Sequence, residues 1–485
     1  MLESILDSNF ILSCDSYKLG HYRQLSTDIE YVYSVTVPRK PSKYSDKITA
    51  VGQTLVAEIF AKVRITSDMI DEAELEATEA GYQFNRPGWE IILREFDGRL
   101  PLAIYGVPEG MVVNPQTPIV GVINTDPRFG WLPAYVETLV QDIIWKMSTV
   151  ATVCRSSRLT IQEFIEKTGA NPDNLEYALH NFGDRAADSP TEAAVMAGMA
   201  HAIYFSGSDC IRANRYIRKL YNTTKTYVTS VEATEHSVMV ANSNSATKDD
   251  FGAAAMAVDL LKYVVERSKR GIGIPVCSAV IDTYDSRRFV KDYIGTRLKE
   301  EVINSGGKLV LRPDTGDITI EPGMVGVDIE NTFGVTRNVL GYKVLPNYIG
   351  VLQGDGIKVH TIRRVLEGWV SAGFSMDNFV LGMGSGISHD SARDDFSCST
   401  KSVAKYEYGR WERMLKEPIT DIGKKSLSGL VYVDSDGIVA DAINSQYGAR
   451  HPAPFVENDN WRLWVHNGYR VYRQAFDEVR ELARR

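Results

Sequence analysis

The sequence predicts an α/β protein in which an irregular β/α barrel is joined to a second, mixed α+β domain. From about residue 175, short apolar runs alternate with helical segments, and polar or glycine-rich residues follow six of these runs. β-like segments also stand near both ends of the chain. We expect residues 1–150 to form an N-terminal α+β part, 151–397 the barrel, and 398–485 a segment that packs back on the N-terminal part.

Six apolar runs are the predicted barrel strands. Each begins with residues that favour strands and ends in Gly, Asp, Glu, His or Arg. The runs read LEYALHNFG, YVTSVEATEHS, IPVCSAVIDTYDS, KLVLRPDTGD, NYIGVLQGDG and DNFVLGMGSG. The carboxyl ends of barrel strands form the active-site face, so these ends mark the predicted site. An open doubly wound sheet would place ligands there too, but six ends with irregular connections favour a barrel.

The remaining pattern predicts further elements. Residues 30–37 and 101–106 are rich in β-branched and aromatic side chains and are predicted strands. Apolar residues at helical spacing predict one or two helices across 131–168. Another helix is predicted from about Phe251, with Thr247 as its cap and Gly271 as its stop.

Composition narrows the class of protein. The chain has 485 residues, 44% hydrophobic and 24% charged, with a net charge of −8. These are globular values, and the acidic balance argues against a nucleic-acid partner. Five scattered cysteines suggest free thiols rather than disulfides or a zinc site. We expect no signal peptide and no membrane span, and therefore a cytoplasmic protein.

The strand ends carry residues suited to a phosphorylated sugar beside a ring. Phe182 is a candidate stacking platform next to the anion-binding Arg185, and Asp209 is a candidate acceptor for an amide or hydroxyl. His236 lies among acids, with Asp282 and Asp285 at the next strand end, and a carboxylate partner would make it more basic and suited to bind or accept a phosphate. Taken singly, each of these residues is more often structural, as a core aromatic, a turn or cap aspartate, or a structural histidine.

Two further strand ends complete the pattern. Arg312 and Asp314 form either an internal salt bridge or a pair that serves a phosphate and sugar hydroxyls. The glycine-rich exits at 354–356 and 382–386 let backbone N–H groups approach an anion closely. Neither exit matches the Walker A or the dinucleotide-binding spacing. Together these features predict a site for a sugar phosphate with a ring nearby.

At these residues the chain resembles the nicotinamide phosphoribosyltransferase family. The matching motifs, in order, are DSYK at 15–18, LHNFGDR at 179–185, SGSD at 206–209, ATEHS at 233–237, RPDTG at 312–316, QGDG at 353–356, and the region of Arg393. The resemblance implies a homodimer with active sites at the subunit interface. It also implies a reaction of nicotinamide with 5-phosphoribosyl 1-pyrophosphate and Mg²⁺ that yields nicotinamide mononucleotide and pyrophosphate.

The resemblance further implies a role for each matching residue. Phe182 and Tyr17 of a second subunit would enclose the pyridine ring, and Asp209 would accept the carboxamide N–H. Arg312 would lie near the ring and the pyrophosphate. The residues that would hold the ribose are Asp314, Gly354 and Asp355, and those that would hold the 5′-phosphate are Gly384, Ser385 and Arg393.

The resemblance also implies how pyrophosphate and ATP are bound. Arg185 and His236 are similar to the pyrophosphate ligands, and His236 to a histidine that ATP phosphorylates, oriented by Asp282. The cations that would reach pyrophosphate or ATP from the partner subunit are Arg39, Lys401 and Lys416, with help from Lys424.

The sequence departs from the family pattern in two places, and three alternatives stay open. Asp184 and Ala186 replace the family's usual Tyr and Gly in FGYRG, and Ser385 stands where a glycine is usual. The alternatives are a nicotinate phosphoribosyltransferase, a non-catalytic nucleotide-binding protein on the same scaffold, and an unrelated barrel enzyme acting on sugar phosphates. A nicotinate carboxylate should avoid Asp209, because like charges in a closed pocket are costly.

Overall fold

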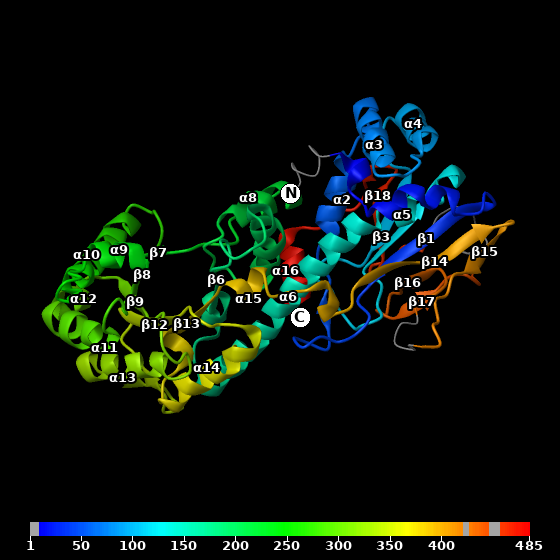
Figure 1. Ribbon diagram of the computed structural model, residues 1–485. Coiled ribbons are helices and arrows are strands. Elements are labelled where there is room, and N and C mark those ends of the chain that lie inside the picture. The colour runs from blue at the N-terminus through cyan, green and yellow to red at the C-terminus, as the bar shows by residue number, and fades with distance from the viewer. Residues whose placement is uncertain (1–8, 421–425, 446–455) are drawn as a thin grey trace.

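The protein contains two large sheets, one antiparallel and one parallel, in a computed structural model that describes residues 9–420, 426–445 and 456–485. Figure 1 shows the sheets in separate parts of the molecule, with the long helix α6 (Glu137–Thr168) running between them. The predicted fold class, an irregular β/α barrel with a second mixed domain, is confirmed.

The antiparallel sheet combines strands from both ends of the chain. Within it, β1 pairs with β14 on one side and with β5 on the other. In spatial order the strands are β15 (Arg410–Arg413), β14 (Ser399–Glu407), β1 (Ile29–Val37), β5 (Val120–Asn124), β3 (Leu102–Gly106), β18 (Arg462–His466) and β19 (Tyr469–Arg470). The predicted strands at 30–37 and 101–106 are thus β1 and β3. The proposed division at residue 150 stays a prediction, and that position lies inside α6.

Helices and short strands complete this part of the molecule. The helices are η1 (Phe10–Leu12), η2 (Ser16–Arg23), α2 (Gln53–Lys62), α3 (Ser67–Glu79), α4 (Arg86–Glu95), η3 (Pro127–Phe129), α5 (Leu132–Tyr135) and α16 (Phe476–Arg484). The short strands are β2 (Ile48–Thr49), β4 (Val112–Val113), β16 (Val431–Val433) and β17 (Val439–Asp441).

The parallel sheet contains all six predicted barrel strands. In spatial order they are β6 (Leu179–Asn181), β13 (Phe379–Met383), β12 (Ile349–Gln353), β9 (Lys308–Arg312), β8 (Val276–Val280) and β7 (Glu232–Ala233). Isolated bridges from Asn181 to Ser208 and from Gly207 to Thr229 continue the pairing beyond β6. Thr229 lies three residues before β7. The irregular segment that contains Gly207 and Ser208 therefore links the two edges of the curled sheet.

Helices follow most of the parallel strands, and α10 to α14 cover the outer side of the curled sheet (Figure 1). The helices of this part are η4 (Pro172–Tyr177), η5 (Glu192–Ala197), α7 (Gly198–Tyr204), α8 (Arg212–Tyr221), α9 (His236–Ala241), α10 (Phe251–Ser268), α11 (Ser286–Arg288), η6 (Phe289–Arg297), α12 (Lys299–Ile303), α13 (Glu321–Phe333), α14 (Val359–Ser371), η7 (Met376–Asn378), α15 (Ser385–Ser388) and η8 (Arg393–Asp395). A small hairpin is formed by β10 (Thr336–Arg337) and β11 (Lys343–Val344).

The predicted cap of α10 is wrong. The helix begins at Phe251 with Asp250 as its cap residue, so Thr247 lies outside it. Residues 244–249 instead form a tight turn, closed by backbone hydrogen bonds between Asn244 and Asp249. The predicted stop at Gly271 agrees with the structure, because the helix ends at Ser268 and Gly271 has a φ of +75°.

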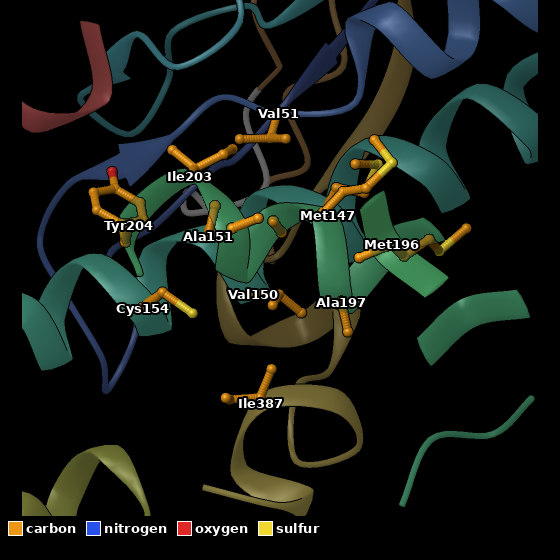
Figure 2. Close-up of a cluster of buried hydrophobic side chains, with 14 of the residues drawn as sticks. Val51, Met147, Val150, Ala151, Cys154, Met196, Ala197, Ile203, Tyr204 and Ile387 are labelled. Carbon is orange, nitrogen blue, oxygen red and sulfur yellow. The ribbon is translucent and has the colours of Figure 1, made fainter. Parts of the chain in front are cut away.

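A buried apolar cluster joins α6 to the parallel-sheet part (Figure 2). Met147, Val150 and Cys154 of α6 lie among side chains of other elements. These come from the segment before α2, from η5, from α7 and from α15: Val51, Met196, Ala197, Ile203, Tyr204 and Ile387. Burial of these side chains therefore anchors α15, the helix that follows the second glycine-rich exit.

All five cysteines are free, as predicted from their scatter. In the described part of the chain, no helix combines the length and the apolar composition that crossing a membrane requires.

The fold predicts a specific loss of stability in acid. His201 of α7 is fully buried, contacts the carbonyl of Leu179 at 3.2 Å, and stacks on Phe205. Burial lowers the pKa of His201 to about 3, whereas a histidine in the unfolded chain titrates near about 6.5. Between these values the unfolded state binds the extra proton, so stability falls as the pH falls.

Between pH 7 and pH 5, the free energy of unfolding of the wild type should fall further than that of His201→Gln. The difference between the two falls should be about 2 kcal/mol. Urea denaturation at several pH values measures this difference. The control is His466→Gln, at an exposed position of β18. Equal acid sensitivity of wild type and His201→Gln would contradict the prediction.

Candidate active site

Phe182 forms a flat platform at the end of β6. Its backbone N–H donates to the carbonyl of Met383 at 2.8 Å, which ties it to the neighbouring strand β13. A Cβ atom on Gly382 would lie 2.0 Å from the Phe182 ring, so only glycine allows the ring to rest against β13. The Arg312 guanidinium lies over the ring, 5.4 Å from its centroid. The three strands β6, β13 and β9 together position this ring.

Four of the predicted residues meet in one cavity of about 470 Å³ at the strand ends. Phe182 supplies an aromatic wall, Arg185 and Arg312 supply positive charge, and Asp209 supplies a carboxylate. The remaining lining residues are Asp184, Ala233, Thr234 and Glu235. A flat wall bordered by both cations and carboxylates can hold a planar ring next to a charged group.

Asp209 is held in place through both its backbone and its side chain. Its backbone N–H donates to Asn181 at 3.0 Å, and the Ser230 hydroxyl donates to its Oδ1 at 2.6 Å. Its Oδ2 accepts no hydrogen bond from the residues that the structure describes. The run before Asp209 is the helix α7 followed by isolated bridges, rather than a strand. Asp209 therefore offers an oriented acceptor to a ligand in the cavity.

A second cluster is built around Asp282, two residues after β8. Its Oδ2 accepts hydrogen bonds from the Asp314 backbone N–H at 2.8 Å and from the Thr315 hydroxyl at 2.7 Å. Its Oδ1 lies 3.1 Å from His236 Nε2, and the side chain is only 6% exposed. His236 Nδ1 lies 3.8 Å from Asp314 Oδ2. The contact between His236 and Asp282 that the sequence suggested is present.

Arg312 connects this cluster to the cavity. Its guanidinium donates to Asp314 Oδ1 at 2.9 Å while it also lies over Phe182. Arg312 therefore forms the internal salt bridge with Asp314 and lines the cavity at the same time. An imidazole, two carboxylates and a guanidinium form one connected network beside the ring platform.

The glycine-rich exits lie close to the platform. A Cβ atom on Gly354 would lie 3.2 Å from the Phe182 ring, and one on Gly183 would lie 2.9 Å from the Gly384 carbonyl. Ser385 begins α15, and Asp355 follows Gly354 in an exposed turn. Arg393 is half-exposed and pairs with Asp394 at 2.7 Å, and it does not line the cavity.

Several predicted residues lie away from this cavity within one chain. Arg39, Lys401 and Lys416 line a separate pocket on the antiparallel sheet that shares no residue with the strand-end cavity. Tyr17 is 55% exposed and donates a hydrogen bond to Asp15. Lys424 lies outside the described residues.

Three contributing residues escaped the sequence analysis. Gly382 belongs to a run that suggested anion binding, but its role here is to make room for Phe182. Ser230 and Thr315 orient Asp209 and Asp282 through their hydroxyls. Ser230 and Thr315 lie inside or beside the quoted runs, yet hydroxyl residues near strand ends are too common to signal such a role.

Two titratable groups near the site, His180 and Cys210, are held in their uncharged forms. Burial lowers the pKa of His180, an effect that the Asp209 carboxylate partly offsets, and burial raises the pKa of Cys210 to about 12. A protonated thiol is a poor nucleophile, which excludes Cys210 from covalent catalysis near neutral pH. Among the described residues, no group of three His, Cys, Asp or Glu is arranged to hold a metal ion.

Fold and site together define an α/β protein with an aromatic and charged pocket at strand carboxyl ends. Residues 177–451 match the model of the nicotinate phosphoribosyltransferase (NAPRTase) family, and residues 9–104 match the nicotinamide phosphoribosyltransferase N-terminal domain. The chain is 32% identical to a nicotinamide phosphoribosyltransferase of Xanthomonas campestris, over 87% of this chain and 86% of that protein. It is 30% identical to one of Acinetobacter baylyi, over 88% of each.

Solved structures agree on the fold. The nicotinate-nucleotide pyrophosphorylase of Pyrococcus furiosus superposes with a TM-score of 0.59 at 16% identity, covering 99% of this chain and 95% of that one. Human nicotinic acid phosphoribosyltransferase gives 0.58 at 17% identity, covering 97% and 92%. The chain belongs to the nicotinate phosphoribosyltransferase family, and it is a phosphoribosyltransferase.

Proposed function

We propose that this protein is a nicotinamide phosphoribosyltransferase of NAD salvage. It would join nicotinamide to 5-phosphoribosyl 1-pyrophosphate, giving nicotinamide mononucleotide and pyrophosphate. The observation that carries the proposal is the single cavity in which Phe182, Asp209 and Arg312 meet. The relatives from Xanthomonas and Acinetobacter are both named nicotinamide phosphoribosyltransferase, which supports nicotinamide as the base.

The charges of the cavity support nicotinamide over nicotinate. With the ring on Phe182, an amide N–H can donate to the free oxygen of Asp209, which Ser230 orients through the other oxygen. A nicotinate carboxylate would instead meet a like charge, which costs free energy in a partly enclosed pocket. The carboxylate of Asp209 is thus the proposed selector of the base.

The network around Arg312 suits the charge changes of the reaction. The ring nitrogen forms a bond to the anomeric carbon while the bond to pyrophosphate breaks, so positive charge develops on the sugar and negative charge on the leaving group. Arg185 and Arg312 would stabilise the leaving group, and Asp314 with Asp355 and Gly354 would hold the ribose. The backbone at Gly384 and Ser385, with Arg393, would hold the 5′-phosphate. Stacking on Phe182 would fix the angle of attack.

Mg²⁺ would arrive with the substrate. Mg²⁺ is commonly bound by substrate phosphates, one or two carboxylates and several waters rather than by an all-protein cage. This fits a site in which the described residues form no three-ligand cluster. The ion would supply charge neutralisation at the pyrophosphate.

His236 is the proposed acceptor of a phosphoryl group from ATP. The γ-phosphoryl group would move to a ring nitrogen of His236 and leave ADP, with Asp282 orienting the ring from 3.1 Å. The cations proposed to contact ATP or pyrophosphate are Arg39, Lys401, Lys416 and Lys424.

The active site is proposed to be shared in a homodimer. Within one chain, Tyr17 and the pocket that contains Arg39 lie apart from the strand-end cavity. This separation supports the proposal that they contribute to the active site of the partner subunit. We place the enzyme in the cytoplasm, a location supported by its five free cysteines.

A side-by-side assay of the two bases tests the proposed function. With 5-phosphoribosyl 1-pyrophosphate and Mg²⁺, we expect product from nicotinamide and at least about tenfold less from nicotinate, as one like-charge contact can cost about 1.4 kcal/mol. Nucleotide formation is quantified by chromatography. Equal or greater use of nicotinate would favour a nicotinate phosphoribosyltransferase, a name that the matching family model also carries. No turnover of either base would favour a binding protein.

Replacement of His236 tests the ATP coupling. We expect His236→Ala to abolish the stimulation by ATP, because the imidazole is needed to accept the phosphoryl group. The same substitution should reduce the ATP-free turnover less than it reduces the stimulation. Initial rates with and without ATP measure both effects. His466→Ala, on the antiparallel sheet, is the control. An unchanged ATP response in His236→Ala would remove His236 from this role.

Mixing two inactive variants tests the shared site. Tyr17→Ala and Phe182→Ala are each expected to lose activity, since each removes one face of the ring slot. In a mixed dimer one site regains both rings, so unfolding and refolding the two together should restore about a quarter of wild-type activity. No recovery, with a dimer confirmed by light scattering, would contradict a site shared through Tyr17.

A further inference from the structure

Asp184 and Arg212 form an ion pair at the rim of the base cavity. Asp184 lines the cavity directly after Gly183, and its Oδ1 accepts a hydrogen bond from Arg212 Nη2. The Cys210 thiol contacts the same oxygen at 3.2 Å. Arg212 begins α8, three residues after Asp209. Asp184 thus lines the same cavity as the ring platform Phe182 and the proposed selector Asp209.

The pair contributes to the charge at one side of the cavity. Arg212 does not line the cavity itself, but its guanidinium touches a carboxylate that does. Both side chains are partly exposed, at 45% for Arg212 and 36% for Asp184. Hydrogen bonding to Asp184 also raises the pKa of Arg212, so the guanidinium stays charged. Without Asp184, the Arg212 guanidinium would lose the ion-pair partner that the structure gives it beside the cavity.

We propose that Asp184 is a second specificity-determining residue, which favours an uncharged base by keeping Arg212 paired at the rim. A free Arg212 would bind the carboxylate of an acidic base such as nicotinate, because guanidinium and carboxylate form bidentate hydrogen bonds. This inference rests on the proposed function. It also gives a physical meaning to Asp184, which stands where the family pattern usually has tyrosine.

The expected effect is moderate because the pair is partly exposed. Exposed ion pairs contribute up to about 1 kcal/mol, which corresponds to about a fivefold change in a rate or binding ratio. Salt should reduce the effect, since screening weakens the attraction of an accessible guanidinium for a carboxylate.

The test compares Asp184→Ala with the double variant Asp184→Ala/Arg212→Ala. For each protein, kcat/KM is measured with nicotinamide and with nicotinate, and binding of both bases is measured by calorimetry. We expect Asp184→Ala to raise the nicotinate-to-nicotinamide ratio about three- to fivefold, and the double variant to return it to the wild-type value. The increase should shrink in high salt.

The matched control is Asp188→Ala. Asp188 is an exposed carboxylate four residues further along the same loop, and it pairs with His389 at 3.1 Å rather than with Arg212. Its loss should leave the ratio unchanged. An unchanged ratio in Asp184→Ala, or an increase that persists in the double variant, would overturn the inference.

Failure of the proposed function is distinguishable from failure of the inference. If the wild type converts neither base, the proposed function fails, and the inference is then judged by the binding ratios alone. Folding of each variant is verified by circular dichroism and by its binding of 5-phosphoribosyl 1-pyrophosphate.

Discussion

The Asp282 carboxylate joins three neighbouring strand ends through hydrogen bonds. It follows β8, accepts from the backbone and hydroxyl groups that follow β9, and contacts His236, which follows β7. The carboxylate itself is buried, and its loss would remove one acceptor from all three of these groups. Asp282 thus contacts His236 and Asp314 directly, and it is linked to Arg312 through Asp314.

The other half of the site depends on close packing and a buried charge. Phe182 rests on Gly382, where no side chain could be accommodated. Nearby, Lys146 of α6 donates to the Ser388 carbonyl at 2.6 Å and pairs with Glu192 at 2.9 Å. The Ser388 hydroxyl in turn donates to the Gly183 carbonyl at 3.0 Å. The helix between the two sheets therefore ties the glycine-rich exit to the loop that carries Arg185.

Much of this arrangement could be predicted from local sequence. The six barrel strands have strong β-forming runs with polar ends, and parallel strands must place those ends on one face. The contact of His236 with Asp282 and the pairing of Arg312 with Asp314 were predictable on the same grounds. Family motifs then named the ring and the reaction.

Other features depend on packing between distant segments. The spatial neighbours β6 and β13 are separated by about two fifths of the chain, so no local pattern could reveal that Gly382 makes room for Phe182. The predicted cap at Thr247 failed because a turn between Asn244 and Asp249 delays the helix. The pair of Asp184 with Arg212 likewise joins a loop to the start of a separate helix.

A crystal structure of the protein with bound nicotinamide mononucleotide tests the central claim most directly. The account predicts that the pyridine ring lies against Phe182, the carboxamide nitrogen donates to Asp209, and the phosphate lies at Gly384 and Ser385. A nucleotide bound with its carboxamide away from Asp209, or bound in the pocket of Arg39 and Lys401 instead, would contradict it.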